Sequence, residues 1–236
     1  MKEEDIRNRV ILNKYLELSA KDIEFFFNDR SKFTETTCPA CDSEDGSSAI
    51  KKESFIYHQC NQCDTIFVNP RPDIESLNNY YTDSPSTSYW VNDFFLPVAE
   101  VRRIKMFKPR AEFIANYFKE TNKLKIADIG SGFGLFLEEL QKIKPNFLLT
   151  AIEPSTEMAE LCKSKKLNVI PLALEDVDAS KYIFDVLTAF ELFEHLHSPG
   201  FFLEKVFHLL KPGGYFVFTT LNGLGFDIQV LWEKAK

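Results

Sequence analysis

Residues 125–137, with the sequence KIADIGSGFGLFL, constrain the fold of this chain more than any other stretch. The first five residues, Lys125 to Ile129, are mostly apolar or β-branched, as in a short buried strand. Three glycines follow within five positions, and apolar residues then recur at helical spacing from Leu135 to Ile143. A strand, a glycine loop and a helix in this order are typical of the first turn of a nucleotide-binding α/β domain. Glycine lets the backbone approach a ligand closely, and the helix N-terminus offers it unpaired N–H groups.

The glycine loop also distinguishes between two kinds of cofactor. The dinucleotide fingerprint G-x-G-x-x-G/A requires a small residue at position 135, where this chain has Leu135. Asp128, two positions before the first glycine, suits a ligand with a cationic amino-acid end better than a pyrophosphate. The pattern Asp128-x-Gly130-x-Gly132-x-Gly134 resembles motif I of the class I S-adenosylmethionine-dependent methyltransferases.

The rest of the carboxy-terminal half alternates between strand and helix patterns. Continuous apolar strands joined by helices imply a parallel sheet with helices on both faces. The predicted fold class is therefore α/β, with a Rossmann-like, mostly parallel sheet of the class I methyltransferase type. Besides the strand at 125–129, the expected strands are 148–152, 168–172, 184–189 and 215–220, and the expected helices are 135–143, 156–166 and 199–210.

The end of the chain departs from that family. Its sheet has seven strands, the last two forming an antiparallel hairpin, but only sixteen residues follow Thr220 here. They suffice for a loop and a short helix. We therefore expect the carboxy-terminal strands to be missing, so that the chain is a truncated or shortened member of the family.

Further motifs resemble the same family in the same order. The resemblance implies that Glu153, at the end of the second strand, accepts hydrogen bonds from both ribose hydroxyls of the cofactor. Leu174 and Glu175 resemble the loop that borders the adenine, although Ala173 stands where many relatives have an acidic residue. FDVLTAFELFEHLHSP resembles motif IV, and LLKPGGYFVFTT resembles the fifth-strand motif. The cofactor-binding residues implied in this way are Asp128, Gly130, Ser131, Gly132, Phe133, Gly134, Glu153, Pro154, Leu174, Glu175 and Phe190.

Glu191-x-x-Glu194-His195 follows the fourth strand, at the sheet edge where open α/β folds bind their ligands. It resembles an element of the quinone-biosynthesis O-methyltransferases and of small-RNA 2′-O-methyltransferases. There the acids and the histidine can hold a divalent ion such as Mg²⁺ against the acceptor oxygens. A further histidine ligand is not identifiable, and His197 is the candidate; the alternative is that Glu194 and His195 are structural.

An acceptor hydroxyl usually needs a base or a metal to remove its proton. We assign His195 as the general base and Glu191 as the residue that orients it or binds a metal, with Glu194 as the third catalytic residue.

Four of the five cysteines form two C-x-x-C pairs, Cys38 with Cys41 and Cys60 with Cys63. Eighteen residues separate the pairs, a spacing typical of a four-thiolate zinc site. The segment has too few apolar residues for a core of its own, so the zinc is expected to be structural. His58 is a possible neighbour that the site does not need. Cys162 is expected to be a small buried hydrophobe.

The amino-terminal half sharpens the resemblance. Its two C-x-x-C pairs, VNPRP at 68–72 and Tyr80-Tyr81 resemble bacterial methyltransferases that carry an N-terminal zinc-binding module. Members of that family are often associated with polysaccharides or modified sugars. The expected function is therefore methyl transfer from S-adenosylmethionine to a small-molecule or carrier-linked acceptor, with a sugar as the leading candidate.

Four segments are expected along the chain. They are a helical segment (1–35), the zinc-binding module (36–72), a helical linker or cap (73–123) and the cofactor-binding domain (124–236). Ser19 and Asp22 resemble the start of a second helix in the first segment. Within 36–123 we expect a polar loop at 42–48, strands at 54–59 and 65–68, a helix at 73–81, a Ser/Thr-rich loop at 82–88 and a helix at 98–119 that restarts at Pro109.

Five basic residues in this last helix allow two interpretations. They form either a solvated helix face or a binding surface for an anionic substrate such as a phosphorylated sugar. The five are Arg102, Arg103, Lys105, Lys108 and Arg110.

Composition excludes several classes of function. The net charge of −7 disfavours non-specific nucleic-acid binding, which depends on phosphate neutralisation. No apolar run is long enough to span a bilayer, and the N-terminus is not a signal peptide, so a cytoplasmic location is expected. Two alternatives stay open: an RNA methyltransferase, and a scaffold protein that binds the cofactor without turnover. The oligomeric state is left open.

Overall fold

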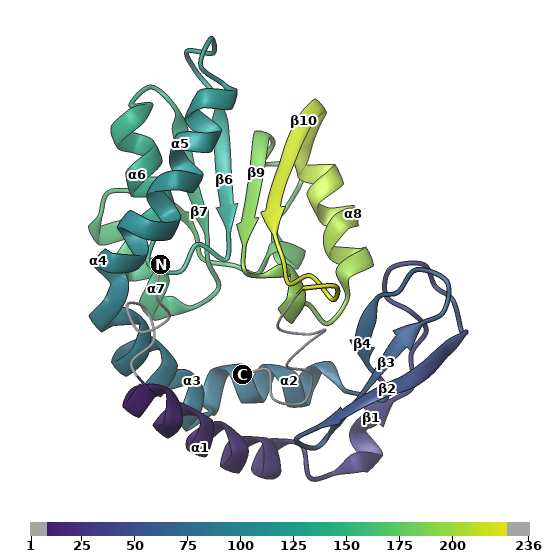
Figure 1. Cartoon of the computed structure of the whole chain (residues 1–236). Coiled ribbons are helices and arrows are strands. Elements are labelled where there is room, and N and C mark those ends of the chain that lie inside the picture. The colour runs from purple at the N-terminus through teal and green to yellow at the C-terminus, as the bar shows by residue number, and fades with distance from the viewer. Residues whose placement is uncertain (1–8, 226–236) are drawn as a thin grey trace. The chain divides into compact units, whose positions relative to one another are not determined.

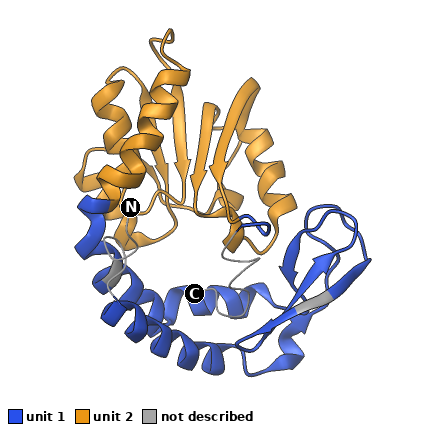
Figure 2. Ribbon diagram, viewed as in Figure 1, with its two compact units in different colours: residues 1–101, 222–236 blue, residues 102–221 orange. Residues whose placement is uncertain are grey.

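The computed structural model describes residues 9–225 (Figure 1). The chain forms two compact units (Figure 2). Unit 1 comprises the residues up to Val101 together with those that follow Leu221, and unit 2 comprises Arg102–Leu221. The helical segment before residue 124 is thus divided between the units, because residues 102–123 belong with the sheet.

The first element that the structure describes in unit 1 is one continuous helix, α1 (Arg9–Phe26). The predicted second helix start at Ser19 and Asp22 is wrong, since both residues are buried within α1. The Asp22 carboxylate instead accepts a hydrogen bond of 2.7 Å from the backbone N–H of Ser86, in the first turn of another helix. A residue that resembles a local cap therefore satisfies an orphan N–H elsewhere in the unit.

That helix, α3 (Pro85–Tyr89), replaces the loop predicted at 82–88. Ser84 accepts a hydrogen bond from the N–H of Thr87 at 3.2 Å, and Pro85 occupies the first turn, a favourable start for a helix. The predicted helix before it, α2 (Ile74–Asp83), is confirmed with Asp73 as its N-cap. The helical run continues through η3 (Trp90–Phe95), η4 (Leu96–Val98) and α4 (Ala99–Arg102).

The cysteine-containing segment of unit 1 is an antiparallel three-stranded sheet in the order β2-β3-β4. Its strands are β2 (Gly46–Lys52), β3 (Phe55–Cys60) and β4 (Ile66–Val68). The strands predicted at 54–59 and 65–68 are confirmed, whereas the predicted loop at 42–48 ends earlier because Gly46 already pairs with Cys60. Beside this sheet lie η2 (Arg30–Lys32) and a short ladder of β1 (Phe33–Thr34) with β5 (Arg71–Pro72).

Unit 2 contains a parallel five-stranded sheet in the order β10-β9-β6-β7-β8, which confirms the α/β fold class. The strands are β6 (Lys125–Ile129), β7 (Leu148–Ile152), β8 (Asn168–Ile170), β9 (Phe184–Phe190) and β10 (Leu210–Thr219). β10 begins five residues before its predicted start, because Leu210 already pairs with Phe184 ahead of the turn at 211–214. Within the described residues β10 pairs only with β9. The short helix predicted after Thr220 falls largely on residues 226–236, outside the described part.

Helices pack on both faces of this sheet, as predicted (Figure 1). One core cluster joins the strands to α5 and α6 through residues such as Ile114 and Phe136, and the other joins them to α8 through Phe202 and Val206. The helical elements of unit 2 are η5 (Arg103–Phe107), α5 (Lys108–Tyr117), α6 (Leu135–Ile143), α7 (Thr156–Ser164), η6 (Leu174–Asp176), η7 (Phe193–His195) and α8 (Pro199–Leu209). Pro109 lies in the first turn of α5, where it restarts the helix as expected. None of the helices in residues 9–225 is long and apolar enough to cross a membrane.

The glycine loop between β6 and α6 depends on left-handed backbone at Gly130, Gly132 and Gly134. Gly134 caps α6 with φ +69°, and a Cβ there would lie 2.7 Å from Leu167 Cδ1 and 3.0 Å from Cys162 Sγ. Cys162 is fully buried, as predicted. Only glycine meets both the conformational and the steric requirement at position 134.

Gly134→Ala is therefore expected to lower the free energy of unfolding by about 2–4 kcal/mol, through left-handed strain and crowding together. The matched control is Gly132→Ala, where φ is +51° but the added Cβ meets no atom within 4 Å. That variant should lose only about 1–2 kcal/mol. Urea unfolding followed by circular dichroism measures both losses. Equal losses would show that crowding by Cys162 and Leu167 does not restrict position 134.

Candidate functional site

The candidate site lies at the carboxyl ends of β6, β7 and β9. The sheet begins at β6 and extends first through β7 and β8, then in the other direction through β9 and β10. The order in which strands are added to the sheet therefore reverses between β6 and β9, which are parallel neighbours. Open α/β sheets bind ligands at such a switch point. The glycine loop, Glu153 and Glu191 follow the three strand ends directly.

Glu153 joins the glycine loop to the next strand and helix. Its Oε2 accepts a hydrogen bond of 2.8 Å from the N–H of Gly132, and its Oε1 accepts one of 2.9 Å from the N–H of Ser155. Burial raises the pKa of Glu153 above its usual value, although these two amides act in the opposite direction. Each carboxylate oxygen retains acceptor capacity beyond these bonds. The side chain therefore fits a pair of ligand hydroxyls such as those of a ribose.

Asp128 lies in β6, just before the glycine loop, and is hydrogen-bonded to the neighbouring strand β9. Its Oδ1 accepts a hydrogen bond of 2.6 Å from the hydroxyl of Thr188 in β9. Burial raises the pKa of Asp128 to about 7, and the Thr188 bond and the charge of Arg110 only partly offset that effect. The sequence marked Asp128 but not Thr188, whose role depends on the register of β6 with β9.

The other implied cofactor residues differ in their surroundings. Leu174 is buried in the core cluster of α8, whereas Glu175 beside it is half-buried. Phe190 packs edge-to-face on Phe136 at 4.9 Å between ring centroids, and the Arg110 guanidinium lies 4.9 Å from its ring. Ser131 and Phe133 are half-buried, and Gly130 and Pro154 are exposed.

Glu191 is held between two arginines from the preceding helices. Arg102 Nη2 lies 3.0 Å from its Oε2, and Arg110 Nη2 lies 2.7 Å from its Oε1. Its backbone has φ +57°, and its N–H donates to the Thr219 hydroxyl at 3.1 Å. Burial raises the pKa of Glu191, but the two guanidinium groups outweigh burial and hold it below its usual value. The carboxylate is thus directed to arginines rather than to His195 in this structure.

Glu194 and His195 lie in η7, one turn beyond β9. Oε2 of Glu194 is buried and has no hydrogen-bond partner in the part of the chain that the structure describes, whereas His195 is exposed. Among residues 9–225, the only group of three or more potential metal ligands is the cysteine cluster. The expected Mg²⁺ site at Glu191, Glu194 and His195 therefore receives no support from the geometry.

The basic segment is not a solvated face at its three arginines. Besides the pairing of Arg102 and Arg110 with Glu191, Arg103 contacts Glu138 at 2.9 Å and Glu139 at 3.1 Å. The interpretation as a solvated face is wrong for these residues. Their partners lie 35 to 89 residues away in the sequence, so no local pattern identifies them.

The cysteine cluster has the geometry of a zinc site. The two knuckles repeat each other: the N–H of Cys38 donates to Ser43 O and that of Cys60 to Thr65 O, each at 2.9 Å. The Sγ atoms of Cys38 and Cys63 lie 3.6 Å apart, as do those of Cys41 and Cys60, and all four lie within 4.8 Å. Tetrahedral zinc with Zn–S bonds of about 2.3 Å requires S–S separations near 3.8 Å. The four thiols therefore fit the ion.

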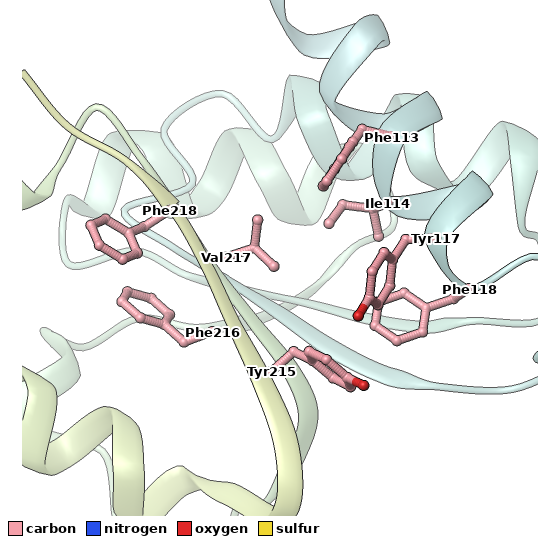
Figure 3. A pocket seen from close by; sticks show the side chains of 8 residues that line it. All are labelled: Phe113, Ile114, Tyr117, Phe118, Tyr215, Phe216, Val217 and Phe218. Carbon is pink, nitrogen blue, oxygen red and sulfur yellow. The ribbon is translucent and has the colours of Figure 1, made fainter.

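A separate apolar cavity of about 320 Å³ lies between α5 and β10 (Figure 3). Aromatic side chains from both elements face it, and no residue of the glycine loop lines it. Its lining residues are Phe113, Ile114, Tyr117, Phe118, Tyr215, Phe216, Val217 and Phe218. This cavity is therefore distinct from the candidate cofactor site.

Comparison with known proteins identifies relatives of the sheet-bearing part. A family profile described as a methyltransferase domain matches residues 101–234, more than half of the chain. The ubiquinone biosynthesis O-methyltransferase of Colwellia psychrerythraea is 31% identical over 106 residues, which cover 42% of this chain and 42% of the relative. The protein of the same name from Coxiella burnetii is 28% identical over 140 residues, covering 55% of this chain and 57% of the relative. The chain thus spans about half the length of these curated relatives.

A solved structure shares the fold. The plantazolicin methyltransferase BpumL in complex with SAH has a TM-score of 0.53 at 21% identity, covering 68% of this chain and 62% of that one. At this identity the likeness establishes the fold alone.

Proposed function

This chain belongs to the methyltransferase domain family, and from that premise we propose that it transfers a methyl group from S-adenosylmethionine to a small-molecule acceptor. The observation that carries the proposal is the position of Glu153. Its buried carboxylate holds the glycine loop by the Gly132 N–H and retains acceptor capacity for a ribose diol. The glycine loop, at the switch point of the sheet, fits the rest of such a ligand.

Bound S-adenosylmethionine would supply an activated methyl group on a sulfonium. The residues of this chain then have three tasks. Glu153 and the loop around Gly132 hold the ligand, the strand ends position the acceptor, and a base removes the acceptor proton. For the base we propose His195, with Glu194 beside it, because the buried Oε2 of Glu194 is available to accept a hydrogen bond.

We propose a hydroxyl group as the acceptor. The similar curated proteins are named O-methyltransferases, and the resemblance of the cysteine-containing half to zinc-module methyltransferases favours a free or carrier-linked sugar. The RNA alternative loses its main support, because Arg102, Arg103 and Arg110 are paired with carboxylates. If the chain is instead a scaffold protein without turnover, it should bind the cofactor but form no methylated product.

Zinc is proposed as the structural ion of unit 1. One zinc per chain is expected in the purified protein, and Cys60→Ser should lose it, because three thiolates leave the coordination sphere open. The control is Cys162→Ser, which changes a buried cysteine outside the cluster and should retain the metal. Elemental analysis measures both. Metal-free wild-type protein, or equal loss in the two variants, would contradict the assignment.

Cofactor binding is tested by calorimetry with S-adenosylhomocysteine, the demethylated product. Glu153→Ala should weaken binding by about 1.5–3 kcal/mol, the range for hydrogen bonds to a charged group. Glu157→Ala is the matched control, because Glu157 is an exposed glutamate four residues further on and should bind as the wild type does. Preferential binding of NAD would refute the interpretation of Leu135.

The acceptor can be sought by mass spectrometry, comparing a deletion strain with the wild type for metabolites that lack one methyl group. With that acceptor, His195→Ala should reduce the rate by about 10²–10⁴-fold while affinity for S-adenosylhomocysteine is unchanged. Activity should persist in a chelator that leaves cofactor binding intact. Loss of activity in the chelator and its return with Mg²⁺ would favour a metal site instead, and full activity of His195→Ala would exclude the base.

A further inference from the structure

We propose that Lys165 is a positioning residue, whose ammonium group holds the carbonyl of Phe133 and with it the cofactor-binding conformation of the glycine loop, and that Glu138 acts on the loop through Lys165. The inference rests on the proposed function, because it concerns the loop to which S-adenosylmethionine is assigned. Lys165 acts on the backbone of that loop, and the inference involves no contact between Lys165 and the cofactor.

The Lys165 side chain joins the end of α7 to the middle of the glycine loop. Lys165 is the C-cap residue of α7, and its Nζ donates a hydrogen bond of 2.7 Å to the carbonyl oxygen of Phe133. Phe133 lies between Gly132 and Gly134, both of which have positive φ. A hydrogen bond with a charged donor is stronger than one between neutral groups. The contact therefore fixes the peptide unit between Phe133 and Gly134.

The glycine loop needs contacts from outside to keep one conformation, because glycine loses more conformational freedom on ordering than any other residue. Glu153 holds the N–H of Gly132, and the thiol of Cys162 donates to the Gly132 carbonyl at 3.2 Å. Together with the contact of Lys165, three consecutive peptide units are each held by one side chain. A loop that is ordered before the ligand arrives loses less freedom on binding, and this increases affinity.

Lys165 is itself held in place. Its Nζ lies 2.8 Å from Oε2 of Glu138 in α6, and the same oxygen accepts a hydrogen bond of 2.9 Å from Arg103 Nη2. The Lys165 and Glu138 side chains are only 21% and 24% exposed. Burial raises the pKa of Glu138, but Lys165 and Arg103 outweigh burial and hold it below its usual value. The charged carboxylate therefore restricts the ammonium group to a position from which it reaches the loop.

Lys163 provides a matched comparison two positions earlier in α7. Its Nζ lies 2.7 Å from Glu160 of the same helix, and the two side chains are 47% and 64% exposed. Exposed pairs of this kind contribute little to stability. The two lysines thus share a helix and a carboxylate partner, but Lys165 also contacts the loop backbone.

The first experiment measures S-adenosylhomocysteine affinity by calorimetry. Lys165→Met, which keeps the aliphatic chain and removes the ammonium group, should weaken binding about 5- to 30-fold, as expected for a partly screened charged hydrogen bond. Lys165→Arg keeps the charge and the donors and should bind within about threefold of wild type. Lys163→Met should bind within about twofold. Unfolded molecules reduce the number of binding sites per chain but not the affinity of folded ones, so a merely structural role would leave the dissociation constant unchanged.

A double-variant cycle tests the role of Glu138. Glu138→Gln should weaken S-adenosylhomocysteine binding about 2- to 5-fold, because the Lys165 ammonium loses its charged partner. In the Lys165→Met background the same change should have no further effect, because the residue through which Glu138 acts is already absent. Additive losses would refute an action of Glu138 through Lys165.

The second experiment does not depend on the cofactor. Hydrogen–deuterium exchange of the ligand-free protein is followed by mass spectrometry in the peptide that covers residues 130–136. The N–H of Gly134 donates to Ser131 O at 2.9 Å, so its exchange reports opening of the loop. Lys165→Met should increase the exchange rate there about 3- to 10-fold, and Lys163→Met should not. This result without any S-adenosylhomocysteine binding by the wild type would refute the proposed cofactor, whereas the positioning of the loop by Lys165 would stand.

Two outcomes would overturn the inference. One is unchanged loop exchange in Lys165→Met, which would mean that Lys165 does not hold the loop. The other is an S-adenosylhomocysteine affinity that Lys165→Met leaves unchanged, that Lys163→Met lowers equally or that Lys165→Arg fails to restore, because none of these results fits a specific charged contact. Circular dichroism of each variant shows whether it is folded.

Discussion

The hydrogen bond from the Gly132 N–H to the Glu153 carboxylate connects the parts of unit 2 on which the site depends. It fixes the loop after β6 to the end of β7, and the second oxygen of the same carboxylate fixes the beginning of α7 through Ser155. The loop can take this course because its three glycines have positive φ. One buried acidic group thereby connects the loop after β6, the end of β7 and the beginning of α7.

Local signals were sufficient for most of the sheet and for this loop. The sequence predicts the strand at 125–129 and the following helix at their observed bounds. A strand that is buried on both faces is continuously apolar, and a helix with one buried face has apolar residues at helical spacing. The errors arose where a local signal has a distant partner. Asp22 resembles a helix cap, but its carboxylate accepts a hydrogen bond from the backbone N–H of Ser86, 64 residues away. The arginines before β6 resemble a solvated face, but they pair with Glu138, Glu139 and Glu191.

The residues of the candidate site also divide into those with a local sequence signal and those that depend on distant partners. The sequence identified Asp128, Glu153 and Glu191 as residues at strand ends, since a position after a buried strand can be read from the pattern. It could not identify Thr188 or the pairing of Arg110 with Glu191, because these depend on strand register and on the path of α5. Charged groups that are brought together from separate elements leave no spacing to recognise, although burying them requires that they be paired.

The two acids of the Glu191-x-x-Glu194 pattern consequently have different environments. Glu191 follows β9 directly and meets two guanidinium groups, which stabilise its charge. Glu194 lies one 3₁₀ turn later, where one oxygen is buried without a partner among the described residues. Among the described residues, the two carboxylates do not belong to any group of three or more potential metal ligands. The two acids of one short pattern therefore have different surroundings, because one is paired with arginines and the other has a buried oxygen without a partner among the described residues.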